Sequence, residues 1–303
     1  AFPTETVYGL GARADRADAV ARIFAAKGRP ADHPLIVHVG DAAAAAEFGE
    51  PIGPSARRLM AHFWPGALTV IVPRRAGVAE TAAAGQASIG LRSPAHPVAR
   101  ALLAAAAERG VRGVAAPSAN RFGRISPTRA VHVAEELGAD LLVLDGGACP
   151  VGIESTIVDC TRDERPTLLR PGMIGRPAIE ALLDGRLAAP DAASPRASGT
   201  LEAHYAPEAR LRLMSADELQ AALDALDADS AGQVAVYSRL TPHVRGLAAD
   251  RRMPASAAAA ARELFAVLRA FDDAGVAQIW VERPAALPEW EGVTDRLRRA
   301  AAA

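Results

Sequence analysis

The sequence is poor in lysine, aromatic residues and cysteine. Of the 34 Lys and Arg residues only Lys27 is a lysine, and aromatic side chains make up 4% of the 303 residues. The two cysteines, Cys149 and Cys160, are too few for a disulfide framework and lack the spacing of zinc ligands. A lysine kept in an arginine-rich chain is a candidate for a task that needs a compact point charge, although composition alone leaves chance as an equal explanation.

Other absences exclude whole classes of protein. No apolar run approaches the roughly 20 residues that a helix needs to cross a bilayer, and the first residues lack the pattern of a secretion signal. There is no Gly-Lys pair for a Walker A loop, no Gly-x-Ser-x-Gly motif, and no metal-ligand spacing among the histidines. The formal net charge of -1 gives no overall basic character. We therefore expect a protein of the reducing cytoplasm without a dedicated transition-metal site.

The order of strand and helix patterns predicts two α/β domains. In the first domain, strands are expected at 35–39, 68–72, 88–92, 111–116, 140–144, 154–160 and 167–170. Because some of these strands follow one another without a helix, we expect a mixed rather than a purely parallel sheet. In the second domain, strands at 211–214, 233–238 and 277–282 alternate with helices, which predicts a small three-layer, Rossmann-like α/β fold.

Composition also indicates the domain boundaries. We assign residues 1–186 to a catalytic domain, 187–208 to a linker rich in Gly, Pro, Ala and Ser, and 209–303 to a C-terminal α/β domain. The chain begins on apolar residues that would continue a strand, which leads us to expect a further segment upstream.

Local signals predict the ends of several helices. Asp15 or Asp18 is expected to cap a helix that Gly28 ends, and Ser126-Pro127 has the signature of a helix start. The stretch 215–218 reads Ser-Ala-Asp-Glu, which is a capping box for a helix of the second domain.

Cationic and hydroxyl side chains gather at the predicted strand ends. They are Thr4, Thr6, Lys27, Arg29, His38, Ser88, Arg92, Ser118, Ser126, Ser155 and Arg170. Such a set suits a polyphosphate and a carboxylate in one cleft, because arginine pairs with either through two N–H groups and hydroxyls satisfy the remaining oxygens. A nucleotidyl transfer depends on positioning and charge neutralisation, so the absence of a protein nucleophile agrees with it.

Each of these residues also has a structural interpretation. Arg92 and Arg170 can be ordinary surface arginines, since nearly every basic residue here is arginine. Ser126 can be only a helix cap, and His38 can be a half-buried histidine of a strand. The stretch 117–120 can be a plain turn. The residue types alone leave these alternatives open.

Six motifs stand out in order along the chain. They are Phe2-Pro3-Thr4-Glu5-Thr6-Val7-Tyr8-Gly9-Leu10-Gly11, Lys27-Gly28-Arg29-Pro30, Pro34-Leu35-Ile36-Val37-His38, Ala116-Pro117-Ser118-Ala119-Asn120, Gly152-Ile153-Glu154-Ser155-Thr156 and Leu169-Arg170-Pro171-Gly172. In this order they resemble the YrdC family of threonylcarbamoyl-AMP synthases. The stretch 204–207, His-Tyr-Ala-Pro, followed by an α/β domain resembles the long two-domain form, so the resemblance covers nearly the whole chain.

The resemblance implies a cytoplasmic nucleotidyltransferase that makes threonylcarbamoyl-AMP and pyrophosphate from L-threonine, bicarbonate and ATP, with Mg²⁺ accompanying ATP. It implies a twisted mixed sheet with flanking helices and a concave surface for residues 1 to 186. The product would feed tRNA modification to threonylcarbamoyladenosine through a downstream tRNA-threonylcarbamoyl transferase machinery. A weak contact with RNA belongs to this expectation, and a membrane does not.

The resemblance also assigns roles to residues. The family's threonine-binding positions fall on Thr6 (with Thr4 as its alternative), His38, Arg92, Ala116 and Ser155. The positions of the ATP site fall on Lys27, Arg29, His33, Ser88, Ser118, Ser126, Arg170 and Tyr205, with Lys27 and Arg29 in the catalytic role. His33 stands where the family pattern leads us to expect asparagine, and Ser88 stands where threonine is commoner.

Two other functions stay open at this point. One is carbamoyl transfer to a protein thiol, as in hydrogenase-maturation relatives with a similar domain; those relatives carry zinc-binding cysteine clusters, which two isolated cysteines do not provide. The other is a non-catalytic RNA-binding module, which the near-neutral net charge disfavours.

Overall fold

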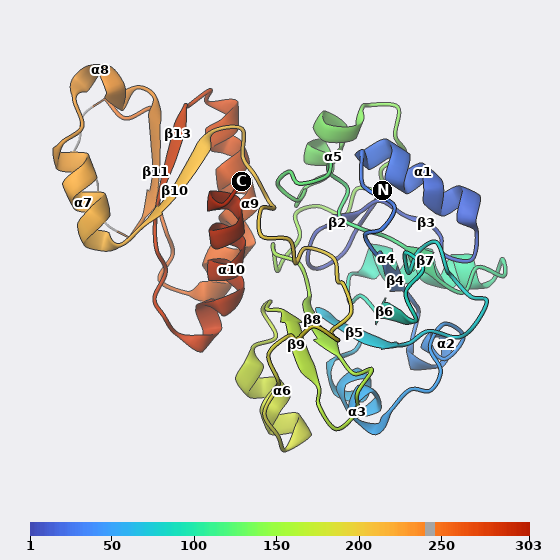
Figure 1. The fold of residues 1–303 in the computed structure, drawn as a ribbon. Coiled ribbons are helices and arrows are strands. Elements are labelled where there is room, and N and C mark those ends of the chain that lie inside the picture. Colours follow the sequence, from blue (N-terminus) through green and yellow to red (C-terminus); the bar gives the residue numbers. More distant parts are fainter. Residues whose placement is uncertain (240–245) are drawn as a thin grey trace. The chain divides into compact units, whose positions relative to one another are not determined.

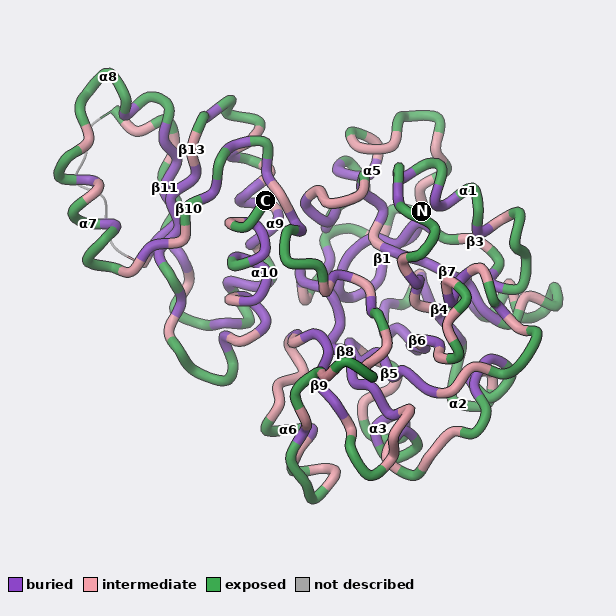
Figure 2. Tube along the Cα trace, in the orientation of Figure 1, coloured by how far each residue is buried: buried purple, intermediate pink, exposed green. Residues whose placement is uncertain are grey.

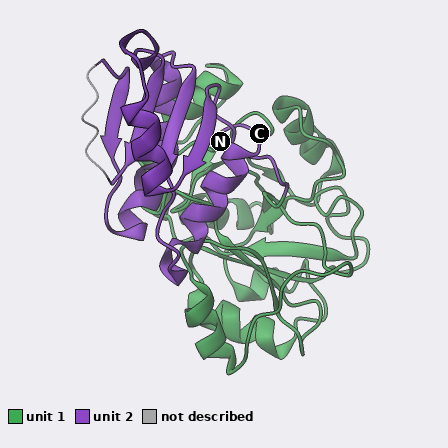
Figure 3. Cartoon of the chain, turned by 60° about the vertical axis from the view of Figure 1, so that its left-hand side comes forward, with its two compact units in different colours: residues 1–122, 126–200 green, residues 123–125, 201–303 purple. Residues whose placement is uncertain are grey.

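The structure is a computed structural model that describes residues 1–239 and 246–303. These residues divide into two compact units (Figure 3): the first holds residues 1–122 and 126–200, and the second holds residues 123–125 and 201–303. The stretch expected to form a linker is therefore shared, with 187–200 in the first unit and 201–208 in the second. Within the described ranges, no helix is long and apolar enough to cross a membrane.

A seven-stranded mixed sheet forms the centre of the first unit (Figure 1), in the order β3-β7-β4-β6-β5-β8-β9. The strands are β3 (Ala12–Arg13), β4 (Ile36–His38), β5 (Leu68–Pro73), β6 (Ser88–Arg92), β7 (Val114–Ala115), β8 (Thr156–Asp159) and β9 (Thr167–Arg170). The pairs β4/β6 and β5/β8 are parallel, whereas β5/β6 and β8/β9 are antiparallel. The expectation of a mixed sheet is confirmed. A two-stranded ribbon, β1 (Phe2–Pro3) with β2 (Tyr8–Gly9), precedes it.

Helices bury their apolar faces around this sheet. They are α1 (Ala17–Lys27), α2 (Ala42–Ala45), α3 (Pro54–Phe63), α4 (Pro97–Ala107), α5 (Ala130–Leu137) and α6 (Arg176–Leu183). In α1, Val20, Ile23 and Phe24 are buried because their spacing places them on one face. Gly28 ends α1 at φ 59°, the left-handed conformation that glycine adopts without a Cβ clash, which confirms the predicted stop. Figure 2 shows the buried backbone following the central strands.

The predicted strand at 140–144 is wrong. This segment makes two backbone hydrogen bonds to Ala1, through the carbonyl of Leu142 and the N–H of Leu144. Both leucine side chains are exposed. Two bonds to a single residue do not make a ladder, and side chains that stay in solvent give no packing energy to extend one.

Two predicted helix starts are also wrong. The N-cap of α1 is Arg16 rather than Asp15 or Asp18, and no side chain caps this helix. The N-cap of α5 is Arg129, three residues after Ser126. The hydroxyl of Ser126 is used elsewhere, because this residue is fully buried and donates to a carboxylate in the interior.

The second unit is a three-layer α/β sandwich around a parallel sheet in the order β10-β13-β11-β12, with helices on both faces (Figure 1). Its elements are β10 (Arg210–Met214), α7 (Ala216–Asp224), α8 (Ala228–Ala231), β11 (Val234–Ser238), β12 (Ala249–Arg252), α9 (Ala257–Asp273), β13 (Gln278–Glu282), the short η1 (Pro288–Trp290) and α10 (Glu291–Ala301). The capping box at Ser215 and Glu218 is confirmed. The predicted three-layer architecture is confirmed too, whereas α8, β12 and α10 lacked a prediction.

Candidate active site

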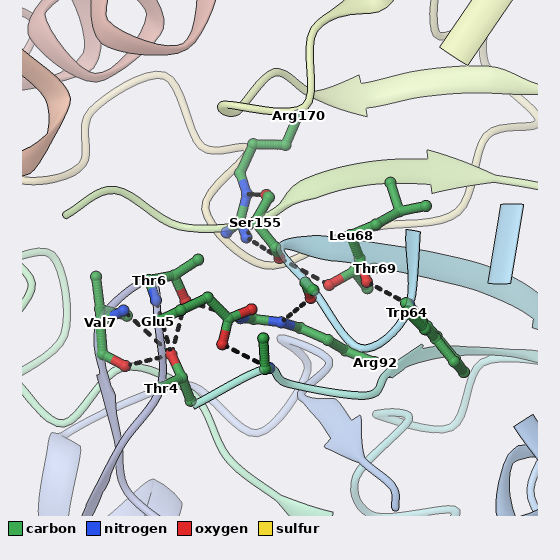
Figure 4. Close-up of polar contacts among 12 residues, drawn as sticks. Thr4, Glu5, Thr6, Val7, Trp64, Leu68, Thr69, Arg92, Ser155 and Arg170 are labelled. Carbon is green, nitrogen blue, oxygen red and sulfur yellow. Dashed lines mark hydrogen bonds and ion pairs between the residues drawn. The ribbon is translucent and has the colours of Figure 1, made fainter. Parts of the chain in front are cut away.

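The loop between β1 and β2 brings two threonine hydroxyls to the end of β6 (Figure 4). The Oγ1 atoms of Thr4 and Thr6 are 2.8 Å apart, and Thr4 donates to the carbonyl of Val7 at 2.7 Å. Nη1 of Arg92, the last residue of β6, donates to Thr6 Oγ1 at 2.8 Å. Because a hydroxyl has one proton to give, the hydrogen bonds must run in one direction, from Arg92 through Thr6 and Thr4 to the carbonyl.

Glu5 lies between these threonines and neutralises the guanidinium. Its Oε1 is 2.5 Å from Arg92 Nη2, and its Oε2 accepts the N–H of Ala95 at 2.9 Å. Burial alone would raise the pKa of the Glu5 carboxyl, but Arg92 and the Ala95 N–H outweigh burial and hold this pKa below its ordinary value. A buried arginine needs such a partner. Sequence reasoning missed Glu5, although the need of Arg92 for a counter-charge is a signal that points to it.

Arg92 keeps donor capacity after these contacts. Among the described residues, its Nε donates to the carbonyl of Gly66 at 3.1 Å, and each terminal nitrogen gives one N–H, to Thr6 and to Glu5. A guanidinium has five N–H groups, so one remains on each terminal nitrogen. Two N–H groups on neighbouring nitrogens are the donor set that pairs with a carboxylate.

His38 lies beside Arg92 because β4 pairs with β6 in a register that places the two residues opposite each other. Its ring stands edge-on to Phe2, with 6.0 Å between the centroids. Burial and the neighbouring Arg92 lower the pKa of His38 to about 3, so the imidazole is neutral. Its Nδ1 makes no hydrogen bond within the part of the chain that the structure describes. A neutral ring with an unused nitrogen can serve a ligand hydroxyl or amine.

Ser155 precedes β8 and is held by two neighbouring strands. Its Oγ lies 2.7 Å from the hydroxyl of Thr69 in β5, with which β8 pairs. Arg170, at the end of β9, donates to the Ser155 carbonyl through Nε at 3.1 Å and Nη2 at 2.9 Å. Because β6, β5, β8 and β9 are consecutive in the sheet, this group and the Arg92 group lie at neighbouring strand ends (Figure 4). Thr69 was missed, and a single hydroxyl within an apolar strand is a weak signal.

Lys27 is the buried last residue of α1. Its ammonium donates to the carbonyl of Ser118 at 2.6 Å and to that of Asn120. Burial, with a contribution from nearby Arg29, lowers the pKa of Lys27 to about 7. The lysine thus fixes the loop 117–120, and this loop is more than a plain turn.

Arg29 follows α1 and packs over an aromatic ring. Its guanidinium carbon lies 5.4 Å from the centroid of Phe122, and its Nη2 donates to the carbonyl of Pro34 at 3.0 Å. The ring of His33 meets the same phenyl group edge-on at 5.2 Å. Phe122 therefore supports two of the predicted ATP-site residues, and sequence reasoning did not include it.

Ala116, Ser88 and Ser126 complete the predicted set within the first unit. The N–H of Ala116 donates to the carbonyl of Ile36 at 3.0 Å, which places it beside β4. Ser88 is the half-buried first residue of β6. Ser126 donates to Glu154, a buried residue that was not singled out in the sequence.

Tyr205 belongs to the second unit. It is buried at a positive φ of 64°, and its ring stacks on Phe265 with 5.5 Å between the centroids. The guanidinium carbon of Arg296 lies 5.3 Å from its centroid. The predicted role of Tyr205 at the ATP site stays a prediction.

Comparison with known proteins shows the family to which the chain is related. The profile of the Sua5/YciO/YrdC family, described as "Telomere recombination", matches residues 1–172. The chain belongs to this family. A second profile, "Threonylcarbamoyl-AMP synthase, C-terminal domain", matches residues 174–302. The resemblance stated from the six motifs is confirmed.

Individual relatives agree with the profiles. The threonylcarbamoyl-AMP synthase of Bacillus subtilis is 44% identical over 220 residues, and that of Pyrococcus abyssi is 42% identical over 218 residues. Each alignment covers 70% of this chain and 62% of the relative, so the chain spans less than two thirds of these curated relatives. The structure of P. abyssi Sua5 complexed with L-threonine matches with a TM-score of 0.89 at 34% identity, over 99% of this chain and 89% of that one. The expected two-domain fold is confirmed.

Proposed function

We propose that this chain catalyses the ATP-dependent synthesis of L-threonylcarbamoyl-AMP from L-threonine and bicarbonate, with release of pyrophosphate. The observation that carries the proposal is Arg92, which is buried, fixed by Glu5 and Thr6, and keeps one N–H on each terminal nitrogen. An α-carboxylate is the ligand that such a fork fits. The similarity to an enzyme crystallised with L-threonine supports this choice of substrate.

The threonine site consists of Arg92 and the polar groups around it. Arg92 would pair with the carboxylate, and the neutral ring of His38 would form a hydrogen bond with the hydroxyl or amine. Thr6 and Ser155 would complete the polar wall, with Thr4 behind Thr6. The backbone of Ala116 closes the set.

The ATP site would use the cations that surround loop 117–120 and the end of β9. Lys27 and Arg29 supply positive charge where the phosphates and the leaving pyrophosphate lie, and Arg170 adds a third cation. Lys27 acts in part through the loop that it fixes. The remaining contacts would come from His33, Ser88, Ser118, Ser126 and Tyr205.

The reaction needs no protein nucleophile. The threonine amine attacks the carbon of bicarbonate, and loss of water gives a carbamate. A carbamate oxygen then attacks the α-phosphorus of ATP, and the bond to the β-phosphate oxygen breaks to release pyrophosphate. Charge developing on the phosphates is stabilised by Lys27 and Arg29, which is the form of catalysis that phosphoryl chemistry needs most.

Mg²⁺ would accompany ATP as its counter-ion. The described residues include no group of three or more histidine, cysteine or acidic side chains that could hold a metal. We therefore assign no protein ligand and no reaction step to the ion. The product would pass to the tRNA-threonylcarbamoyl transferase machinery in the cytoplasm, and a weak RNA contact would be detected as a salt-dependent mobility shift.

One experiment tests the activity. The protein is incubated with ATP, labelled bicarbonate and a panel of amino acids, and acyl-adenylates are identified by mass. We expect an adenylate that depends on both bicarbonate and threonine, together with pyrophosphate. Pyrophosphate release that does not depend on the amino acid, or an adenylate that contains no carbon from bicarbonate, would refute the proposal.

A further inference from the structure

Residues 196–198 come from the stretch that composition marks as linker, yet they are fixed on the first unit. The main chain of Arg196 is held at both polar groups by Gln86: its N–H donates to Oε1 at 2.9 Å, and its carbonyl accepts from Nε2 at 3.2 Å. Ala197 is buried in a small apolar cluster. The other buried members of this cluster are Ile71, Ile157 and Leu169. The segment therefore packs on β5, β8 and β9.

Ser198 uses both its side chain and its main chain to bind two arginines. Its Oγ donates to the carbonyl of Pro34 at 2.8 Å and accepts from Nη2 of Arg29 at 3.3 Å. Its carbonyl accepts from Nη1 of Arg170 at 2.9 Å. One residue thus joins the cation that follows α1 to the cation that ends β9.

The bonds from Ser198 to the two arginines affect ligand binding because arginine side chains are long and flexible. An unrestrained guanidinium loses side-chain entropy when it binds a ligand, and holding it beforehand removes part of that cost. Pro34 and Ser198 accept from the same nitrogen of Arg29, so the orientation of this group depends on both. A small cavity under the segment is lined by Ser88 as well as Ser198, which brings a third predicted ATP-site residue to the same place.

We propose that Ser198 is a positioning residue for ATP, which holds Arg29 and Arg170 at the separation that the nucleotide needs. The inference rests on the proposed function, because it takes these arginines as ligands of ATP. It predicts that loss of the Ser198 hydroxyl weakens the binding of ATP more than that of threonine. Among the described residues this hydroxyl bonds to Pro34 and Arg29, and Arg92 makes no hydrogen bond to the segment. Ser155 is linked to the segment through the Ser198 carbonyl and Arg170.

The first test compares Ser198→Ala with Ser194→Ala. Ser194 is a matched control, because it lies in the same predicted linker and its hydroxyl bonds to neither arginine. Among the described residues this hydroxyl accepts the N–H of Asp191 at 3.0 Å and donates to its carboxylate at 3.1 Å. Binding of ATP to the full chain is measured by calorimetry without threonine. We expect Ser198→Ala to weaken ATP binding about three- to tenfold, the usual result of losing the one hydrogen bond that this hydroxyl makes to Arg29, and Ser194→Ala to match the wild type. Ser198→Thr, which keeps a hydroxyl, should restore most of the affinity.

A second variant tests the carbonyl that Arg170 uses. Gly199 has a φ of 70°, so Gly199→Ala strains the turn that presents the Ser198 carbonyl. We expect a higher KM for ATP in both Gly199→Ala and Ser198→Ala. The KM for threonine and the melting temperature should change little in Ser198→Ala, because this variant keeps the carbonyl that holds Arg170. A purely structural role would change both KM values together.

The outcomes separate this inference from the proposed function. If the wild type binds ATP but makes no threonylcarbamoyl-AMP, the proposed activity fails, and the binding comparison still decides on Ser198. If Ser198→Ala binds ATP as tightly as Ser194→Ala, the inference is overturned whatever the activity. If the wild type does not bind ATP, the inference is overturned as well.

Discussion

The cations of the first unit differ in the groups that accept their hydrogen bonds. Arg92 is paired with the carboxylate of Glu5 at 2.5 Å, so this buried pair carries no net charge. Lys27 donates to the carbonyls of Ser118 and Asn120, and Arg170 donates to those of Ser155 and Ser198. These carbonyls are neutral acceptors, unlike the carboxylate that holds Arg92.

The difference matches the ligands that we assign to the two sites. Threonine brings one carboxylate and one amine, so a neutral buried pair with two remaining N–H groups suits it. The triphosphate of ATP brings several negative charges, and an excess of protein cations is needed to balance them. The family resemblance assigns a role to each residue, and the Arg92–Glu5 pair supplies a physical reason for placing the single carboxylate of threonine beside Arg92.

Breaking the Arg92–Glu5 pair should have the largest effect on activity and stability. We expect Arg92→Met to lower kcat/KM for threonine about 100-fold or more, because the carboxylate of bound threonine loses the guanidinium with which it would pair. The free energy of unfolding should fall by about 3–5 kcal/mol, since Glu5 is left buried and unpaired. Steady-state kinetics and urea denaturation measure the two effects.

The double variant Arg92→Met with Glu5→Gln serves as the control for this experiment. It removes both charges, so stability should return toward that of the wild type while threonine binding stays lost. Wild-type kinetics for threonine in either variant would show that Arg92 does not bind the substrate.

The second-largest effect is expected at Lys27. Lys27→Met should lower kcat/KM for ATP about 100-fold, because it removes a charge near the phosphates and frees the loop that carries Ser118. The KM for threonine should change little. Arg22→Met, which removes an exposed cation from the same helix, is the matched control and should behave as the wild type. Equal pyrophosphate release by Lys27→Met and Arg22→Met would contradict the role of the lysine.

Much of the fold was predictable because its signals are local. The mixed sheet followed from strands without intervening helices, and Gly28 and the capping box at 215–218 act on neighbouring backbone groups. Ser126 failed as a helix start for the opposite reason. Its hydroxyl is used by Glu154, which is distant in sequence, and local pattern contains no information about that contact.

The candidate site also contains residues that the sequence indicates and residues that only the tertiary structure reveals. Their residue types and their positions at predicted element ends indicated Arg92, Lys27 and Ser155 as residues that carry chemistry, and their placement in the family's sites stays a prediction. The residues that hold these side chains in place could not be predicted from the sequence. Thr69 and Ser198 act through contacts between strands and across the proposed linker, so their roles depend on tertiary structure.

The smallest expected effect is a dependence of folding stability on pH that comes from His38. The folded state keeps this ring neutral, with its pKa lowered to about 3, whereas the unfolded chain binds a proton near pH 6.5. As pH falls below 6.5 the unfolded state therefore gains protons that the folded state does not, and stability decreases. Between pH 6.5 and 5.5 the contribution of His38 should fall by about 1 kcal/mol. Urea denaturation of the wild type and of His38→Gln over this range measures it. The difference in stability between the two proteins should shrink as pH falls, and parallel curves would show that the ring is protonated in the folded state.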